Sequence, residues 1–496
     1  MKTHLSKREI KKGYAAIKDL AKESFRKGDT DQSLRYIKHC AILAQQFNWI
    51  YSDEDLEILL QRIGERFIPE QTASFSPISG RVVFYDDFCT SFILALQYMR
   101  ALVAAGKNIL YITPKREGEK RKFNGIIPEV SSYPNVQVVS LPKGSEAEKT
   151  KFLYRTIIDY RPEKVLLHMK AYSVALPALY RLPSCIDRYI INLADQTFWL
   201  GSKAIDYSLE FRPFGATVSK QRRGLRHEQV LMLPFYPVVD NYPFDGFPPQ
   251  CTDEKVVIFS GGDLYKVCSS NGLYWKLVKR ILDTHNNVIF LFATKVDSGK
   301  VSIIKNFISA NGFQDRFVYM SYRKDISEVF KHCDIYMGTC PASGSLMSQL
   351  AAIHGKPILQ YYETGTPDDE TEQAICINSS YPISFHEEDL FLAEATHLIN
   401  DKSYRLEQGE KLKQALISKN QFDSGLSYSL KYNQSPFPYD TRAIDYSQLE
   451  DRWYDLEKTG FTDTLPYICG VLGGTNCFKK APSIYTKKII RQLFSS

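Results

Sequence analysis

The stretch VVIFSGGDLYKVCSSNGLYWKLVKRIL, residues 256–282, decides the fold. It opens with a short run of β-branched and aromatic residues that ends at Ser260, continues through two glycines, and then has apolar residues at helical spacing. This order predicts a buried strand, a tight turn and an amphipathic helix. The same alternation continues downstream, with further apolar runs at 287–294, 316–321, 333–338 and 356–362. Strands that alternate with helices predict parallel pairing in a doubly wound sheet.

A second alternating series lies upstream, with strands expected at 81–88, 108–113, 136–141, 164–169 and 188–193. Residues 234–254 separate the two series and contain five prolines, which is typical of a linker. The fold class is therefore α/β, with two Rossmann-like domains. In such sheets ligands bind at the carboxyl ends of the strands, so we expect the domains to face a cleft that holds the site.

The two ends of the chain are predicted to be helical. Apolar residues at helical spacing indicate a helix pair interrupted at Gly28 and a third helix over 53–67. We expect four parts: a helical N-terminal extension (1–70), an N-terminal Rossmann-like domain (78–235), a C-terminal Rossmann-like domain (250–440), and a helical tail that packs back on the N-terminal domain (441–496).

The composition excludes several classes of protein. The 496 residues are 44% hydrophobic and 24% charged, as in ordinary globular proteins, and a net charge of +7 is too weak to predict nucleic-acid binding. The ten cysteines form no CxxC pair and the nine histidines have no metal-ligand spacing, so we predict no metal and no cofactor. Without a signal peptide or an apolar stretch long enough to span a bilayer, the expected location is cytoplasmic.

Two motifs suit a diphosphate. Gly261 and Gly262 allow a tight turn beside the ligand, and Lys266 can neutralise the charge that develops on a departing diphosphate. The alternative is a glycine turn with a solvated lysine. The second motif lies in 333–357, where Ser343, Gly344 and Ser345 stand at a helix start, which favours anions. The alternative here is an N-capping serine without a ligand.

The segment 255–365 resembles the donor site of O-linked N-acetylglucosamine transferases and their bacterial cytoplasmic relatives. Four residues match that family's N-Q-L-Y-K motif and the helix after it: Leu264, Tyr265, Lys266 and Trp275. Residues 342–348 correspond to the family's G-H-T-T-G-M-D, with Ser348 where the family has its ribose-binding aspartate. The resemblance implies the GT-B fold, a UDP-sugar donor and inversion at the sugar carbon. The donor-side residues are Gly261, Gly262, Asp263, Tyr322, Arg323, Ser343, Gly344, Ser345 and Ser348.

Acceptor-side candidates follow strands of the N-terminal domain. Asp195 could act as a general base, and Gln196 and Trp199 could contact a sugar. Asp86 and Asp87 follow the first strand of that domain. The alternative is a capped loop with a buried tryptophan.

These residues predict a metal-independent glycosyltransferase that moves a sugar from a nucleotide-sugar to a hydroxyl of a glycan or protein, in polysaccharide biosynthesis, with Lys266 and Asp195 as catalytic residues. The alternatives are a sugar-nucleotide epimerase and a non-catalytic protein of the same fold. The basic C-terminus, residues 478–494, either packs back on the protein or contacts an acidic membrane surface.

Overall fold

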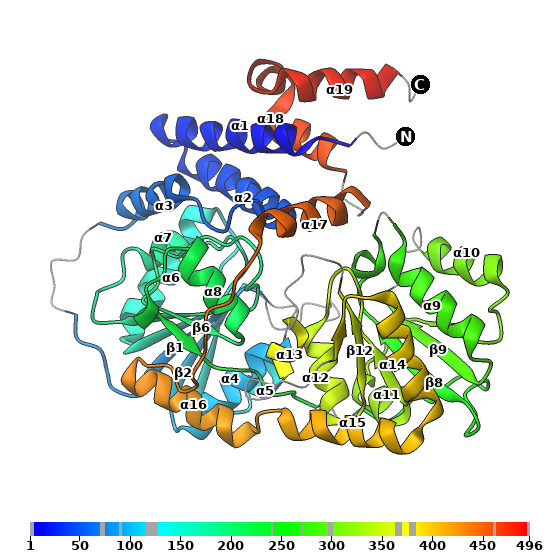
Figure 1. Ribbon diagram of the computed structural model, residues 1–496. Helices are drawn as coiled ribbons and strands as arrows, with labels where there is room; N and C mark the ends of the chain where they lie inside the picture. Colours follow the sequence, from blue (N-terminus) through cyan, green and yellow to red (C-terminus); the bar gives the residue numbers. More distant parts are fainter. Residues whose placement is uncertain are drawn as a thin grey trace. The chain divides into compact units, whose positions relative to one another are not determined.

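The structure is a computed structural model that describes residues 4–69, 75–88, 92–114, 126–239, 242–269, 271–295, 301–362, 370–375, 383–459 and 463–493 (Figure 1). The chain divides into two compact units. Unit 1 comprises Met1–Leu233, Asn420–Arg442 and Thr462–Ser496, and unit 2 comprises Pro234–Lys419 and Ala443–Phe461.

The sheet of unit 1 has seven parallel strands in the order β3-β2-β1-β4-β5-β6-β7. The first five strands coincide with the apolar runs from which the sequence analysis predicts strands. The last two are too short for that signal. The bounds are β1 (Arg81–Asp86), β2 (Asn108–Thr113), β3 (Val136–Ser140), β4 (Lys164–His168), β5 (Asp187–Ile191), β6 (Tyr207–Glu210) and β7 (Val230–Met232).

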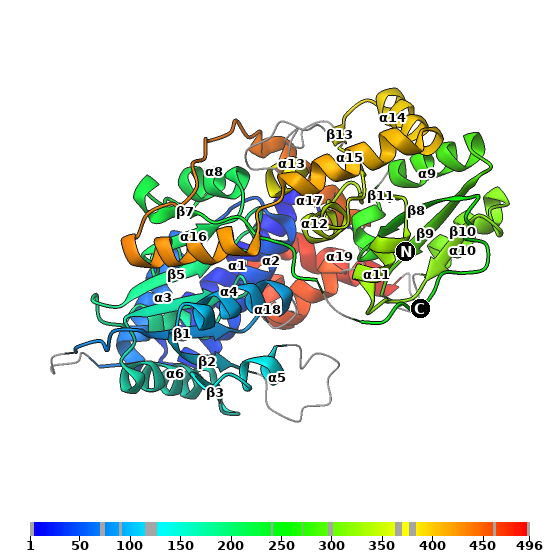
Figure 2. The same ribbon diagram turned by 90° about the horizontal axis from the view of Figure 1, so that it is seen from below.

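Helices cover both faces of this sheet (Figures 1 and 2). One face carries α4 (Phe92–Ala104) and α16 (Lys419–Tyr432), where Tyr98 and Phe422 meet edge to face at 5.0 Å. This contact explains why residues 420–442 group with unit 1, although the expected C-terminal Rossmann-like domain extends to residue 440. The other elements are α5 (Ile127–Val130), α6 (Glu146–Tyr160), α7 (Leu176–Leu179), α8 (Pro213–Arg222) and η1 (His227–Gln229).

The N-terminal extension forms α1 (Lys7–Arg26), α2 (Thr30–Phe47) and α3 (Glu54–Phe67). The predicted break at Gly28 is confirmed, because Asp29 caps α2 by accepting from the Gln32 amide at 3.0 Å. The extension is built into unit 1 through Glu57 of α3, which is buried and accepts a hydrogen bond from the Gly201 amide at 2.7 Å.

The C-terminal hairpin, α18 (Thr464–Lys480) and α19 (Pro482–Leu493), packs on α1. The contact depends on Gly13, where a Cβ atom would lie 2.8 Å from Ile468 Cδ1 and 3.3 Å from Ile484 Cδ1. Within the described residues, no helix combines the length and the hydropathy required to cross a membrane.

Unit 2 has a sheet of six parallel strands in the order β10-β9-β8-β11-β12-β13. The strands are β8 (Val256–Gly261), β9 (Val288–Ala293), β10 (Phe317–Met320), β11 (Ile335–Met337), β12 (Ile358–Tyr361) and β13 (Ser384–Phe385). One buried core includes α9 (Leu273–Thr284) and α14 (Glu388–Asn400), and the other includes α11 (Ile326–His332), α12 (Ser345–Ile353) and α15 (Lys402–Ala415). The remaining elements are η2 (Leu264–Val267), α10 (Val301–Asn311), α13 (Glu370–Ile375) and α17 (Tyr446–Thr459).

Both sheets reverse their strand order at one place, between β1 and β4 in unit 1 and between β8 and β11 in unit 2. Ligands of doubly wound sheets bind outside the carboxyl ends of the strands at such a switch point. The residues that follow these four strands are therefore the first place to look for a site in each unit.

Candidate functional site

The loop after β8 is shaped by its two glycines. A Cβ atom on Gly261 would lie 2.7 Å from the carbonyl oxygen of Ala293, and Gly262 has a φ of +145°, which residues with a side chain rarely adopt. The short helix η2 then buries Leu264 and Val267 in the core and leaves Lys266 half-buried at the edge of the sheet. The backbone thus directs Lys266 away from the core.

The loop after β11 leads to the start of α12. Gly338 is required there, because a Cβ atom would lie 1.8 Å from Gln360 Oε1. Gln360 Nε2 donates to the Thr339 carbonyl at 3.0 Å, and the Thr339 hydroxyl donates to the Ala342 carbonyl at 2.7 Å. The helix then begins at Ser345 with Gly344 as its N-cap, which has no side chain to cap the first backbone N–H groups. Such a terminus attracts anions.

The two loops meet at Lys266. Its Nζ donates to the Ser343 carbonyl at 3.3 Å, across 77 residues of sequence, and a Cβ atom on Gly344 would lie 3.4 Å from the same Nζ. The lysine ammonium therefore lies at the N-terminus of α12. A positive side chain and the positive end of a helix dipole share one place, as a diphosphate site requires.

The other donor-side candidates differ from Lys266 in their burial and in their contacts. Ser348 is fully buried and donates to the Gly344 carbonyl at 3.4 Å. Arg323 holds the Asp325 carboxylate through two bonds of 2.7 and 2.6 Å and also donates to the Gly246 carbonyl, so its visible role is to anchor the linker. Asp263 is exposed as the N-cap of η2, and Tyr322 is 53% exposed.

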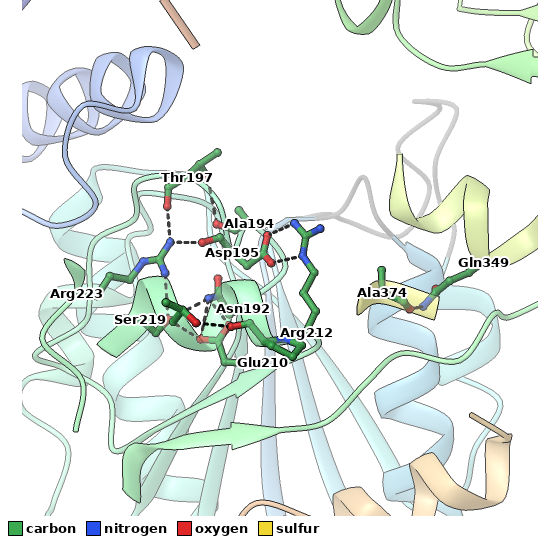
Figure 3. A network of polar contacts seen from close by, with 12 residues as sticks. Asn192, Ala194, Asp195, Thr197, Glu210, Arg212, Ser219, Arg223, Gln349 and Ala374 are labelled. Atoms are coloured by element: carbon green, nitrogen blue, oxygen red, sulfur yellow. Dashed lines mark hydrogen bonds and ion pairs between the residues drawn. The ribbon is translucent and has the colours of Figure 1, made fainter. Parts of the chain in front are cut away.

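Asp195 lies inside unit 1 (Figure 3). Its carboxylate accepts two hydrogen bonds from Arg212, at 2.6 Å from Nε and 2.9 Å from Nη2, and both residues are about 1% exposed. Arg223 donates to the Asp195 carbonyl at 2.7 Å and lies over the ring of Trp199, which is 3% exposed. The Gln196 carbonyl accepts a bond of 2.6 Å from Asn48. These bonds give the loop an internal, structural role.

A further buried carboxylate supports this loop. Glu210 accepts from Asn192 at 2.9 and 2.8 Å and from the Ser219 hydroxyl at 2.6 Å, and burial raises the pKa of its carboxyl group (Figure 3). A Cβ atom on Gly215 would lie 2.6 Å from Glu210 Oε2 and 2.7 Å from Asp195 Cβ, so the glycine lets both acidic side chains pack against α8 at this point.

The switch point of unit 1 holds Asp86, Asp87 and His168. Asp86 and His168 are the last residues of β1 and β4 and pair in register, with 2.9 Å between Oδ1 and Nδ1. The Tyr111 hydroxyl donates to the other Asp86 oxygen at 2.7 Å. His168 Nε2 is buried and has no hydrogen-bond partner within the described part of the chain. The sequence analysis missed His168. The signal that could have identified it is its place at the end of the strand that neighbours β1.

Asp87 is the second carboxylate of this cluster. Burial raises the pKa of its carboxyl group to about 6, against the opposing hydrogen bonds, one of them a bond of 2.9 Å from the Lys170 amide. A carboxylate with a pKa near neutrality can accept a proton efficiently in catalysis.

No protein-family model and no curated protein matches the chain. Solved structures do match, and they show the GT-B fold of glycosyltransferases, so the predicted fold class is confirmed. The O-GlcNAc transferase of Thermobaculum terrenum, in a lysine-to-methionine mutant, is 13% identical with a TM-score of 0.53 over 90% of this chain and 85% of that one. HepE of Anabaena in complex with UDP is 12% identical, with a TM-score of 0.52 over 71% and 99%. A glycosyltransferase of Rickettsia africae is 12% identical, with a TM-score of 0.51 over 71% and 99%.

Proposed function

We propose that the protein is a glycosyltransferase that uses a nucleotide-sugar, of which UDP-sugars are the first class to test. One observation carries the proposal: Lys266 Nζ lies 3.3 Å from the Ser343 carbonyl at the start of α12. The position is the switch point of unit 2, where a doubly wound sheet binds its ligand. The O-GlcNAc transferase and the UDP complex among the similar structures support this donor class.

In the proposed reaction the bond between the sugar carbon and the diphosphate oxygen breaks, and its electron pair stays on the diphosphate. Lys266 and the backbone N–H groups at the start of α12 stabilise the resulting charge. Other transferases neutralise this charge with a bound cation. Because Lys266 and the start of α12 would supply the positive charge here, we propose a metal-independent reaction. The acceptor oxygen bonds to the sugar carbon and gives its proton to a base.

We assign the acceptor side to the cluster of Asp86, Asp87 and His168, not to Asp195. Both oxygens of Asp195 already accept from Arg212, whereas His168 Nε2 is a buried nitrogen without a described partner. The proposed acceptor is a hydroxyl of a glycan or protein, which would place the protein in polysaccharide or glycoconjugate synthesis.

A thermal-shift screen against UDP, GDP and their sugar conjugates tests the donor. A ligand that binds the folded state alone raises the melting temperature by mass action. We expect a rise with one nucleotide family, and a smaller rise for Lys266→Met. Uniform melting with every nucleotide would contradict the proposal.

Product analysis with the identified donor then separates the remaining possibilities. Release of the nucleotide with transfer of the sugar, or with its slow transfer to water, supports a transferase. An epimerised nucleotide-sugar would identify an epimerase, and tight binding without any product would identify a non-catalytic protein of this fold.

A further inference from the structure

A buried threonine, Thr339, lies between β11 and the start of α12. Only 1% of the residue is exposed. Its hydroxyl donates to the Ala342 carbonyl at 2.7 Å, which is the usual length of a well-formed hydroxyl hydrogen bond. The bond therefore fixes the Ala342 carbonyl relative to the end of β11.

The backbone of Thr339 is itself held from the neighbouring strand. Gln360 of β12 is fully buried, and its Nε2 donates to the Thr339 carbonyl at 3.0 Å and to the Tyr361 carbonyl at 2.9 Å. The Gly338 amide donates to the Leu359 carbonyl at 3.0 Å, which continues the pairing of β11 with β12. Thr339 is thus anchored to the sheet of unit 2.

Two consecutive residues beyond Thr339 contact Lys266 at its two ends. The Ala342 amide donates to the Lys266 carbonyl at 3.4 Å, and Lys266 Nζ donates to the Ser343 carbonyl at 3.3 Å. Both bonds are long, so they restrain the lysine only while Ala342 and Ser343 keep their places. The shorter bond from the Thr339 hydroxyl holds Ala342 in its place.

The methyl group of Thr339 lies near the glycine turn after β8. A Cβ atom on Gly262 would lie 3.5 Å from Lys266 Cδ and 4.0 Å from Thr339 Cγ2. The methyl group and the stem of the lysine therefore border the same space. The two functions of the side chain can be separated, because Thr339→Ser keeps the hydroxyl and removes the methyl group, whereas Thr339→Val keeps a methyl group and removes the hydroxyl.

We propose that Thr339 is a positioning residue for sugar transfer. Through its bond to Ala342 it fixes the segment that holds the backbone and the ammonium of Lys266 beside the start of α12. The assignment rests on the proposed function, because the donor diphosphate is the ligand that Lys266 would meet there. Since Thr339 is buried, it acts through the lysine and not by contact with the diphosphate.

A double-mutant cycle on the full chain tests this assignment, with the affinity for UDP measured by isothermal titration calorimetry. Thr339→Val should weaken binding about tenfold, an ordinary coupling between members of one hydrogen-bond network. In the Lys266→Met background the same substitution should change the affinity by less than about twofold, because the group that Thr339 positions is absent. Thr339→Ser should bind within about twofold of the wild type, because it retains the hydroxyl.

Thr150→Val is the matched control. Thr150 is a fully buried threonine of unit 1 whose hydroxyl donates to the Val174 carbonyl at 3.1 Å, so the variant loses the same kind of bond in the other unit. Both valine variants should lower the melting temperature, but only Thr339→Val should weaken binding. If Thr339→Val does not fold, Thr339→Ala takes its place in the cycle, because it removes the hydroxyl without adding a methyl group beside the Ala342 carbonyl.

Four results would overturn the assignment: normal binding by folded Thr339→Val, the same loss in Thr339→Ser, the same loss in Thr150→Val, or an undiminished effect in the Lys266→Met background. GDP and inorganic pyrophosphate are the further probes. If pyrophosphate binds the wild type and neither nucleotide does, the proposed function fails, and the cycle measured with pyrophosphate still decides the role of Thr339. If none of the three binds, both proposals fail.

Discussion

The two sheets share one topology and carry opposite chemistry at their switch points. In unit 1 the ends of β1 and β4 present two buried carboxylates and a histidine, with Asp86 and His168 2.9 Å apart. In unit 2 the ends of β8 and β11 present glycines, a lysine and an uncapped helix terminus. One switch point has the chemistry of a proton acceptor and the other has the chemistry of an anion site, although the two sheets share one architecture.

The difference also extends to how polar groups are satisfied. Unit 1 pairs Asp195 with Arg212 and surrounds Glu210 with hydrogen-bond donors, which makes this part of the sheet edge rigid. In unit 2 the ammonium of Lys266 contacts a neutral carbonyl, and small residues surround it. The buried carboxylates of unit 1 are thus held by arginine, amide and hydroxyl donors, whereas Lys266 donates to a backbone carbonyl beside the start of α12.

The largest effect is expected from Asp195→Asn. The substitution leaves the Arg212 charge buried without its counter-ion, which typically costs about 3–5 kcal/mol. The free energy of unfolding, measured by urea denaturation, should fall by that amount. In the double variant Asp195→Asn/Arg212→Met the loss should be smaller than the sum of the single losses. Wild-type stability combined with abolished sugar transfer would instead restore Asp195 as the catalytic base.

Lys266→Met should affect catalysis and not folding. The methionine keeps the length of the side chain and removes the charge that opposes the departing diphosphate, so the rate of transfer should fall about 10²–10³-fold. Lys276→Met, an exposed lysine of α9, is the matched control and should be near normal. Transfer at the wild-type rate by folded Lys266→Met would remove the lysine from the mechanism.

Asp87→Asn should change the pH dependence of stability. The folded-state pKa is raised from 3.8 to about 6, so the folded protein holds this proton more tightly than the unfolded chain does. The stability that depends on the protonated form is complete below about pH 4 and is lost as the pH rises through about 6. Asn does not titrate, so the variant should gain up to about 3 kcal/mol over the wild type at neutral pH and little at about pH 4. Equal gains at both pH values would show that the carboxyl group does not titrate there.

Gly344→Ala should give the smallest effect. Its φ of −127° suits alanine, so the free energy of unfolding should change by less than about 0.5 kcal/mol. The new methyl group would lie 3.4 Å from Lys266 Nζ and should weaken nucleotide binding about fivefold, or roughly 1 kcal/mol. Gly338→Ala, which clashes with Gln360 Oε1, should lower the melting temperature instead. If both variants behaved alike, the loop at Gly344 would be structural rather than ligand-facing.

Local patterns predicted the structure around the loop after β8 well. The apolar run before Gly261 and the helical spacing after Gly272 describe a strand, a turn and a helix whose order needs no tertiary information. The start of α12 after Gly344 was also predicted, because small residues before an apolar helical run indicate an N-terminus. The meeting of Lys266 with Ser343 followed from both motifs lying at strand ends.

The strands and side-chain contacts that the sequence analysis missed depend on pairing between segments that are far apart in the sequence. The strands β6 and β7 span four and three residues, and β6 includes the buried polar residues Ser208 and Glu210, so no apolar run marks it. The contact of His168 with Asp86 depends on the register between β1 and β4. The contact of Asp195 with Arg212 depends on the pairing of β5 with β6, because each residue lies after one of these two strands. Such contacts are decided by the assembled sheet and leave no pattern in a short window of sequence.

The chain passes between the two units four times, at 233/234, 419/420, 442/443 and 461/462. The third and fourth passages enclose α17, which packs against η2, the short helix that carries Lys266. A fragment cut at the first passage and ended at the second would therefore lack a helix that buttresses the lysine. In evolution the same arrangement opposes exchange of either unit as a cassette, because the gene segment for unit 2 is interrupted by a stretch that belongs to unit 1.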